Sequence, residues 1–192
     1  NIGNSYTGEV LKTTEDSYTV AEISSFQLET VHEFHPVVSA ILNITPDHLN
    51  RHHTMECYAH TKERIAKNQN KSDVCVLNME DEELYRFGKE CSASVVWFSS
   101  RRKPCKGAYL DGNNIRYTDG VTDKIMLNVH DMNLLGTHNY ENVCAAIAMT
   151  KAVGIPDDII IEQIKNFKAV EHRIEYVATK NGVWYYNDSK GT

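Results

Sequence analysis

Side chains able to hold a divalent cation follow two apolar stretches of this sequence, and a lysine lies on the helical stretch after them. Glu22 ends the apolar run 18–23, the pair Asp47 and His48 follows a second run, and Lys62 lies on a segment with helical spacing. A carboxylate and an imidazole can share a divalent cation, and Mg²⁺ prefers oxygen ligands. A buried strand offers little to satisfy a lone carboxylate, so Glu22 needs a cation unless it faces solvent from an edge strand.

Other interpretations of these residues stay open at the level of chemistry alone. His48 and His52 lie four apart, which could indicate zinc, but no third nitrogen or sulfur ligand is in register. Pro46 also argues against a continuous helix before His48. For His48 alone, a satisfied surface histidine is the better explanation on chemistry alone. Lys62 followed by Glu63 is typical of a solvated helix face.

Amide and charged side chains in the last third of the sequence have the spacing of a nucleotide site. Asn139 and Asn142 lie three apart near a predicted helix start, so they share one face and could hold a purine edge. A helix cap would account for Asn139 alone. Arg173 precedes a predicted strand and Asp188 follows its partner, so the two could meet, the arginine on phosphate and the aspartate on a ribose hydroxyl. A surface ion pair is the alternative.

The elements that must position these residues alternate between strand and helix. Near-continuous apolar runs predict strands, and the amphipathic stretches between them predict helices. Strands are expected at residues 18–23, 37–43, 73–78 and 94–98, and helices at 25–33, 55–68 and 82–91. This alternation predicts an α/β fold with a mostly parallel sheet covered on both faces, and ligands bind beyond the carboxyl ends of such strands.

The pattern changes after residue 107. The turn 111–114, Asp-Gly-Asn-Asn, predicts a hairpin within a small antiparallel β subdomain. Its strands are expected at residues 108–110, 114–117 and 124–129. Two helices and a final hairpin should follow, at residues 137–153, 158–167, 173–178 and 183–186. Asp157 is expected to cap the second of these helices, and Asn181-Gly182 to make the last turn.

Composition bounds the class of protein. The 192 residues are 41% hydrophobic and 24% charged, which is ordinary for a globular domain, and the net charge of −6 leaves no basic excess for general nucleic-acid binding. No apolar run approaches a membrane span. The five cysteines contain no C-x-x-C pair, which favours reduced thiols, and no signal peptide is seen. We expect a cytoplasmic protein with neither nucleic-acid nor membrane partners.

A series of segments resembles, in order, the motifs of the Mur ligase family. Leu-Asn-Ile-Thr-Pro-Asp-His-Leu-Asn-Arg-His resembles the metal-histidine motif, and residues 58–62 resemble the segment with a carbamylated lysine. Gly-Thr-His-Asn-Tyr-Glu-Asn, His-Arg-Ile-Glu and Asn-Asp-Ser-Lys-Gly-Thr are similar to its three nucleotide motifs. The segment 22–29, Glu-Ile-Ser-Ser-Phe-Gln-Leu-Glu, is similar to the version found in D-glutamate-adding members. The resemblance covers nearly the whole chain.

This resemblance implies a role for each matching residue. The implied Mg²⁺ ligands are Glu22, His48 and a carbamylated Lys62, and the implied catalytic residues are Lys62 and His48. The implied ATP site comprises Asn139, Asn142, Arg173, Asp188, Lys190 and Thr192. The implied substrate contacts are Asn1, Ser24, Gln27 and His48.

The activity implied by the resemblance is ATP- and Mg²⁺-dependent amide ligation. The substrates would be D-glutamate and UDP-N-acetylmuramoyl-L-alanine, joined through an acyl phosphate in peptidoglycan synthesis. The alternatives are another Mur-type ligase, a ligase similar to folylpolyglutamate synthetase, or a non-catalytic nucleotide-binding domain. The Ser-Ser-Phe-Gln-Leu-Glu stretch favours the D-glutamate-adding ligase over these alternatives.

One departure from the family pattern is the glycine-rich P-loop, which is absent and would precede Asn1. We therefore expect residues 1–192 to be the central ATP-binding domain of a P-loop-type fold, truncated at both ends. The first strand, the P-loop, the N-terminal UDP-binding domain and the C-terminal domain would be missing. We expect such a piece to be inactive alone and to self-associate through sheet surface that the missing elements would cover.

Overall fold

The computed structural model describes residues 5–168, 172 and 175–189. Its strands are β1 (Val38–Ile41), β2 (Val74–Asn78), β3 (Ser94–Ser99), β4 (Gly107–Asp111), β5 (Asn114–Thr118), β6 (Asp123–Asn128), β7 (Glu175–Lys180) and β8 (Val183–Asn187). Its α-helices are α1 (Tyr6–Glu9), α2 (Ser25–Leu28), α3 (Leu49–His52), α4 (Met55–Glu63), α5 (Glu82–Glu90), α6 (Thr137–Ala152) and α7 (Asp157–Asn166). Three short 3₁₀ turns, η1 (Val10–Lys12), η2 (Arg64–Ala66) and η3 (Val129–Asp131), complete the described elements.

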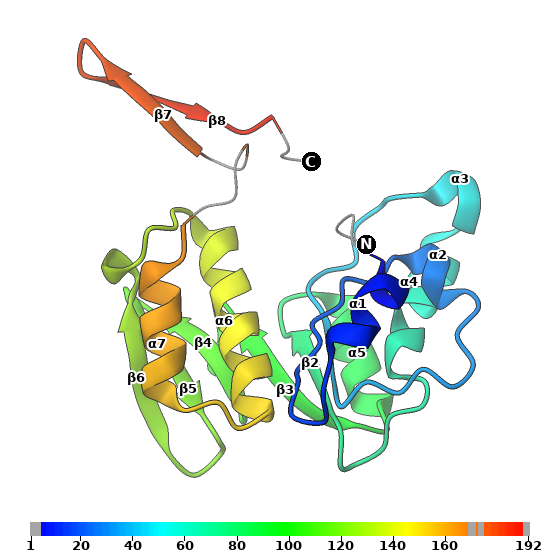
Figure 1. Ribbon diagram of the computed structural model, residues 1–192. Helices are drawn as coiled ribbons and strands as arrows, with labels where there is room; N and C mark the ends of the chain where they lie inside the picture. Colours follow the sequence, from blue (N-terminus) through cyan, green and yellow to red (C-terminus); the bar gives the residue numbers. More distant parts are fainter. Residues whose placement is uncertain (1–4, 169–171, 173–174, 190–192) are drawn as a thin grey trace.

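A six-stranded sheet in the order β1-β2-β3-β4-β5-β6 forms the centre of the molecule (Figure 1). The pairs from β1 to β4 are parallel, and those from β4 to β6 are antiparallel. The predicted α/β fold with a mostly parallel sheet is confirmed. The three antiparallel strands that the turn 111–114 predicted are present, and they extend this same sheet.

Helices cover both faces of the sheet because successive strand residues point to opposite sides. In β2, Val76 belongs to the core packed against α6, whereas Cys75 and Leu77 belong to the core under α4 and α5. All three side chains are buried. A strand buried on both faces reads as a continuous apolar run, which is why β1, β2 and β3 could be predicted from the sequence.

Residues 18–23 form no strand, contrary to the prediction. The described stretch 13–24 contains neither helix nor strand, and Val20 is 92% exposed. Its β-branched and aromatic residues favour a strand, but a strand also needs a neighbour to complete its hydrogen-bond ladder. Within the described chain, β1 ends the sheet and pairs only with β2. Glu22 therefore lies in an irregular, exposed segment instead of ending a buried strand.

Three smaller differences concern helix ends. The helix predicted at 25–33 stops after four residues as α2, and the short α3 was not predicted. Asp157 was wrongly predicted to cap α7. Pro156 holds the cap position, and the Asp157 carboxylate instead accepts hydrogen bonds from Lys124 and Lys151. These two ammonium groups hold the pKa of Asp157 below its usual value.

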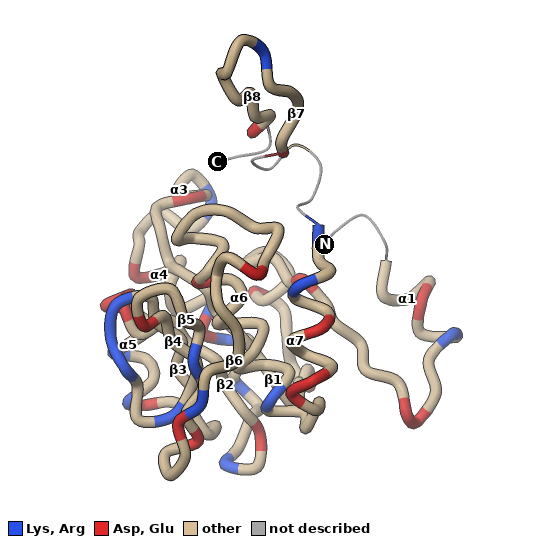
Figure 2. Tube along the Cα trace, turned by 90° about the vertical axis from the view of Figure 1, so that its left-hand side faces the viewer, with Lys and Arg blue, Asp and Glu red and all other residues tan. Residues whose placement is uncertain are grey.

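The predicted final hairpin is present as β7 and β8, with left-handed backbone at Asn181 and Gly182. Figures 1 and 2 both show it standing away from the central sheet, and no other described element packs extensively on it. Its aromatic side chains remain exposed, including Trp184 and Tyr185. Figure 2 shows acidic and basic residues scattered along the chain. No described helix is long and apolar enough to cross a membrane.

Candidate functional site

The start of α2 holds the two predicted substrate-binding residues, Ser24 and Gln27, in a reciprocal cap. The Gln27 backbone N–H donates to Ser24 Oγ at 3.3 Å, and the Ser24 N–H donates to Gln27 Oε1 at 2.8 Å. This capping box satisfies backbone donors that the first turn leaves without helical partners. It also fixes both side chains against each other, so any ligand would meet them in one arrangement.

His48, predicted as a metal ligand, lies at the N-cap of α3 in left-handed backbone geometry, with φ of 52°. Its ring is exposed, and Nε2 lies 3.4 Å from Asp47 Oδ2. The other carboxylate oxygen of Asp47 accepts the His48 backbone N–H at 2.8 Å. A carboxylate beside an imidazole is the arrangement that orients histidine ligands in metal sites.

Lys62 is half-buried on α4, with Nζ 5.0 Å from the centre of the Tyr58 ring. A cation at this distance over a tyrosine face is stabilised by the ring quadrupole. Tyr58 is itself buried, so the contact fixes the course of the lysine side chain. Tyr58 and Lys62 lie four apart on α4, so this contact fits a solvated helix face as well as a functional lysine.

Four rings from three helical segments contact one another in series, the outer two pairs tilted by 41° and 52°, and are here called the aromatic column: Tyr58, His52, Phe26 and His48. Their centroids follow one another at 5.1, 5.8 and 5.0 Å, and the central pair, His52 and Phe26, is parallel to within 9°. His52 is buried, and its Nε2 lies 3.0 Å from Ser25 Oγ. His52 therefore joins α3 to α2 instead of completing a zinc site with His48.

Three charged contacts reinforce the same junction. Arg51 makes two hydrogen bonds to Glu29, at 2.8 and 3.2 Å, and these hold the pKa of Glu29 below its usual value. Arg64, in η2, donates to the backbone carbonyl of Leu28 at 2.8 Å. Side chains from two later segments, α3 and η2, therefore secure a helix of only four residues.

The predicted magnesium ligands come from three separate segments: the irregular stretch with Glu22, the α3 cap with His48, and α4 with Lys62. Oxygen donors from Glu22 and from a carbamate on Lys62 would suit Mg²⁺. Among the residues that the structure describes, no group of three His, Cys, Asp or Glu side chains could hold a metal ion.

The predicted nucleotide residues are described only in part. Asn139 lies in the first turn of α6 and donates from Nδ2 to the Leu135 carbonyl at 2.7 Å, and Asn142 is exposed one turn on. Asp188 is exposed after β8. Figure 1 shows the start of α6 and the α2–α3 region at the same end of the molecule. The other predicted site residues, Asn1, Arg173, Lys190 and Thr192, lie outside the described residues.

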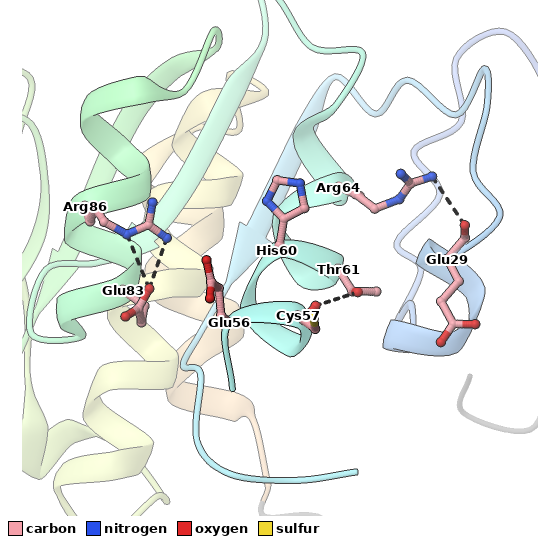
Figure 3. Close-up of a pocket in the computed structure, with 8 residues that line it drawn as sticks. All are labelled: Glu29, Glu56, Cys57, His60, Thr61, Arg64, Glu83 and Arg86. Carbon is pink, nitrogen blue, oxygen red and sulfur yellow. Dashed lines mark hydrogen bonds and ion pairs between the residues drawn. The ribbon is translucent and has the colours of Figure 1, made fainter. Parts of the chain in front are cut away.

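A hollow of about 1100 Å³ lies between α4, α5 and the end of α2 (Figure 3). It is lined by Glu29, Glu56, Cys57, His60, Thr61, Arg64, Glu83 and Arg86. Arg86 pairs with Glu83 at 3.0 Å, and Arg64, in η2, already donates a hydrogen bond to the Leu28 carbonyl. The described residues predicted for the site do not line this hollow, so it is not the predicted ligand site.

Sequence reasoning found His48 and Lys62 but missed what Phe26 and His52 do. The signal available was the aromatic or histidine character of residues 26, 48, 52 and 58. Nothing in the sequence shows that these rings stack, because Phe26 is more than 20 residues from its partners, and His52 was considered only as a zinc ligand.

Comparison with known proteins identifies the family of this chain. A family model for the Mur ligase middle domain matches residues 1–150. The chain is 83% identical over 192 residues to a UDP-N-acetylmuramoylalanine–D-glutamate ligase from Lachnospira eligens, and 54% identical to the protein of that name from Lachnoclostridium phytofermentans. It covers 43% and 42% of these relatives, and thus spans less than half their length.

A solved structure gives a likeness in fold. MurF from Acinetobacter baumannii matches with a TM-score of 0.62 at 17% identity, over 80% of this chain and 33% of that one. The family model covers most of the sequence, including the capping box of α2, the aromatic column and the start of α6. The chain belongs to the Mur ligase family.

Proposed function

We propose that the whole protein is an ATP-dependent ligase that adds D-glutamate to UDP-N-acetylmuramoyl-L-alanine in peptidoglycan synthesis. The observation that carries this proposal is the 83% identity, along all 192 residues, with a relative named for that ligase activity. The match spans the α2 segment, whose Ser-Ser-Phe-Gln-Leu-Glu sequence in this chain is similar to that of D-glutamate-adding enzymes in the resemblance described above. Cytoplasmic location is part of the same proposal.

The proposed reaction has two steps. The substrate carboxylate attacks the γ-phosphorus of ATP, which gives an acyl phosphate and ADP. The amine of D-glutamate then attacks the acyl carbon, and the tetrahedral intermediate collapses to the amide and releases phosphate. Most of the rate enhancement would come from holding donor and acceptor in line and from offsetting phosphate charge.

The residues of this chain would bind and orient these reactants. Ser24 and Gln27 would contact the UDP-linked substrate from their fixed cap, and Asn139 and Asn142 would contact the nucleotide from one face of α6. We propose the same substrate role for Asn1, and nucleotide contacts for Arg173, Asp188, Lys190 and Thr192.

Mg²⁺ is the proposed cofactor, and it would supply positive charge beside the phosphates. Its proposed ligands are Glu22, His48 and Lys62. An unmodified ammonium repels Mg²⁺, whereas reaction of the neutral Lys62 amine with CO₂ releases a proton and leaves a carbamate anion.

The proposal is tested with the full-length protein by measuring phosphate release while each substrate is omitted in turn. Release should require ATP, UDP-N-acetylmuramoyl-L-alanine and D-glutamate together, and replacing D-glutamate by D-alanine or L-lysine should abolish it. Phosphate release that prefers another amino acid would overturn the substrate assignment. The 192-residue chain alone, our proposed central domain, should release no phosphate under the same conditions.

A further inference from the structure

The aromatic column has a property that packing alone does not explain. At its centre lies a buried polar ring, His52, which is only 5% exposed. Burial of an imidazole is unfavourable unless its nitrogens are hydrogen-bonded, and an aliphatic side chain would fill the same space without that cost. The bond between His52 Nε2 and Ser25 Oγ and the parallel stack on Phe26 give this ring a defined orientation.

The helices joined by this ring cannot set their own positions. α2 and α3 have four residues each, far below the length at which a helix is stable alone. Their placement therefore depends on tertiary contacts, and one buried contact between the two helices runs through His52.

Both helices present predicted site residues at their N-terminal ends. α2 begins with the Ser24–Gln27 cap, and α3 begins with His48. Phe26 lies between the two groups, with its ring 5.0 Å from the His48 ring and 5.8 Å from the His52 ring. Movement of Phe26 would consequently change the relative placement of the α2 cap and His48.

We propose that His52 and Phe26 are positioning residues: His52 holds Phe26, and Phe26 holds the His48 ring in one orientation beside the α2 cap. The importance of that orientation for catalysis rests on the function proposed above, whereas the orientation itself is a property of this chain.

The direct test is the nuclear magnetic resonance spectrum of the histidine rings in the 192-residue chain. His48 signals are assigned by their loss in His48→Gln. Phe26→Leu and His52→Gln should each move the His48 ring signals toward those of exposed His130, because the ring current and the fixed orientation are lost. His52→Phe keeps a ring against Phe26 but loses the hydrogen bond to Ser25, so it should leave them closer to their wild-type positions than His52→Gln does.

The controls separate positioning from general stability. His130→Gln removes an exposed histidine in η3 and should leave the His48 signals unchanged. Phe26 is 45% exposed, so its replacement by leucine should leave the chain folded, and circular dichroism checks this. Unchanged His48 signals in folded Phe26→Leu and His52→Gln would overturn the proposal.

Activity of the full-length enzyme gives a second readout. Phe26→Leu and His52→Gln should lower kcat by about tenfold or more while KM for ATP stays within about twofold, since small displacements of reacting groups cost rate. His52→Phe should recover most of the lost kcat. Unchanged kcat in both variants would contradict the positioning role. Absence of activity in the wild type would refute the proposed function. The His48 ring signals would still test whether Phe26 and His52 hold the His48 ring.

Discussion

The Lys62 ammonium lies over the Tyr58 ring, whereas the proposed function requires a carbamate anion on this side chain. We expect Lys62→Ala and Lys62→Arg in the full-length protein to lower kcat by about a hundredfold or more, because neither side chain can carry a carbamate that binds metal. Arginine preserves the positive charge over Tyr58, so its failure would separate the carbamate from the cation–ring contact. Phosphate release is the measurement.

The matched control for Lys62 is Lys71→Ala, which removes an exposed lysine from the loop before β2. It should retain wild-type activity. Full activity in either Lys62 variant would show that the carbamate role is wrong.

The carboxylate of Asp73, directly before β2, stabilises the loop that leads into this strand. Its Oδ2 lies 2.6 Å from His35 Nε2 and accepts the Asn70 N–H at 2.8 Å, and these bonds lower the pKa of Asp73 below its usual 3.8. A carboxylate with a depressed folded-state pKa adds stability above its unfolded-state pKa, and this stability is lost as pH falls through the folded-state pKa.

We therefore expect Asp73→Asn to lower Tm at neutral pH, and the difference from wild type to shrink as pH falls below about 4. Thermal denaturation followed by circular dichroism at a series of pH values measures this. Asp16→Asn, at an exposed position, is the control and should change Tm little. A Tm difference for Asp73→Asn that stays constant down to the lowest pH would contradict the assignment.

At the scale of elements, α5 is anchored by one fully buried side chain. Leu84 is 0% exposed and packs in the core beneath α4 and α5. Leu84→Ala should cost about 2–5 kcal/mol of unfolding free energy through lost burial and a cavity. For a domain of this size, Tm should fall by roughly 5–15 °C.

Leu11→Ala is the matched control for Leu84, because Leu11 is 92% exposed. Its effect on the unfolding free energy should stay within about 0.5 kcal/mol. Equal effects of the two substitutions would mean that α5 does not pack as described.

The β7–β8 hairpin depends on its turn more than on its surroundings. Gly182 has φ of 77°, and an added Cβ would meet no atom within 4 Å, so alanine there costs only backbone strain of about 1–2 kcal/mol. Gly182→Ala should therefore speed hydrogen exchange of the hairpin amides by about tenfold or more, since each 1.4 kcal/mol is a factor of ten. Global Tm should not change. Lys180→Ala in the same hairpin is the control, and a loss of global Tm in Gly182→Ala would show that the hairpin supports the main sheet.

The elements differ in how far the sequence could predict them, and the reason is where their stabilising partners lie. β2 and β3 are buried on both faces and carry the signal in their own residues. The run 18–23 carries the same signal, but a strand also needs a neighbour, and the described chain offers none. α3 has no periodicity to read in four residues, and its position depends on His52 and Phe26, whose stacking no local pattern encodes.

At the scale of the whole molecule, the α2–α3 junction and the predicted nucleotide site differ in how many of their residues the structure describes. The α2–α3 junction is made entirely of described residues, with the aromatic column and the Arg51–Glu29 pair holding it together. The predicted nucleotide site includes Arg173 and Lys190, which lie outside the described residues. Motif order predicted His48 at the first and the nucleotide residues at the second, but it did not predict the ring contacts of Phe26 and His52 that build the junction.

Exposed large apolar side chains of the described molecule include those of the segment before α2 and those of the β7–β8 hairpin. Tyr18 and Val20 are 69% and 92% exposed in the irregular segment before α2, and Trp184 is 65% exposed on the hairpin. Contiguous exposed apolar surface favours association.

We expect the 192-residue chain to self-associate, so that its mass by light scattering rises between a dilute and a concentrated sample. Val20→Ser and Trp184→Ser separate the two surfaces, because the variant that removes the contact should remain a monomer at both concentrations. Exposed Val121, in the β5–β6 turn, gives the control Val121→Ser, which should associate as the wild type does. A wild-type chain that is monomeric at both concentrations would refute the expectation.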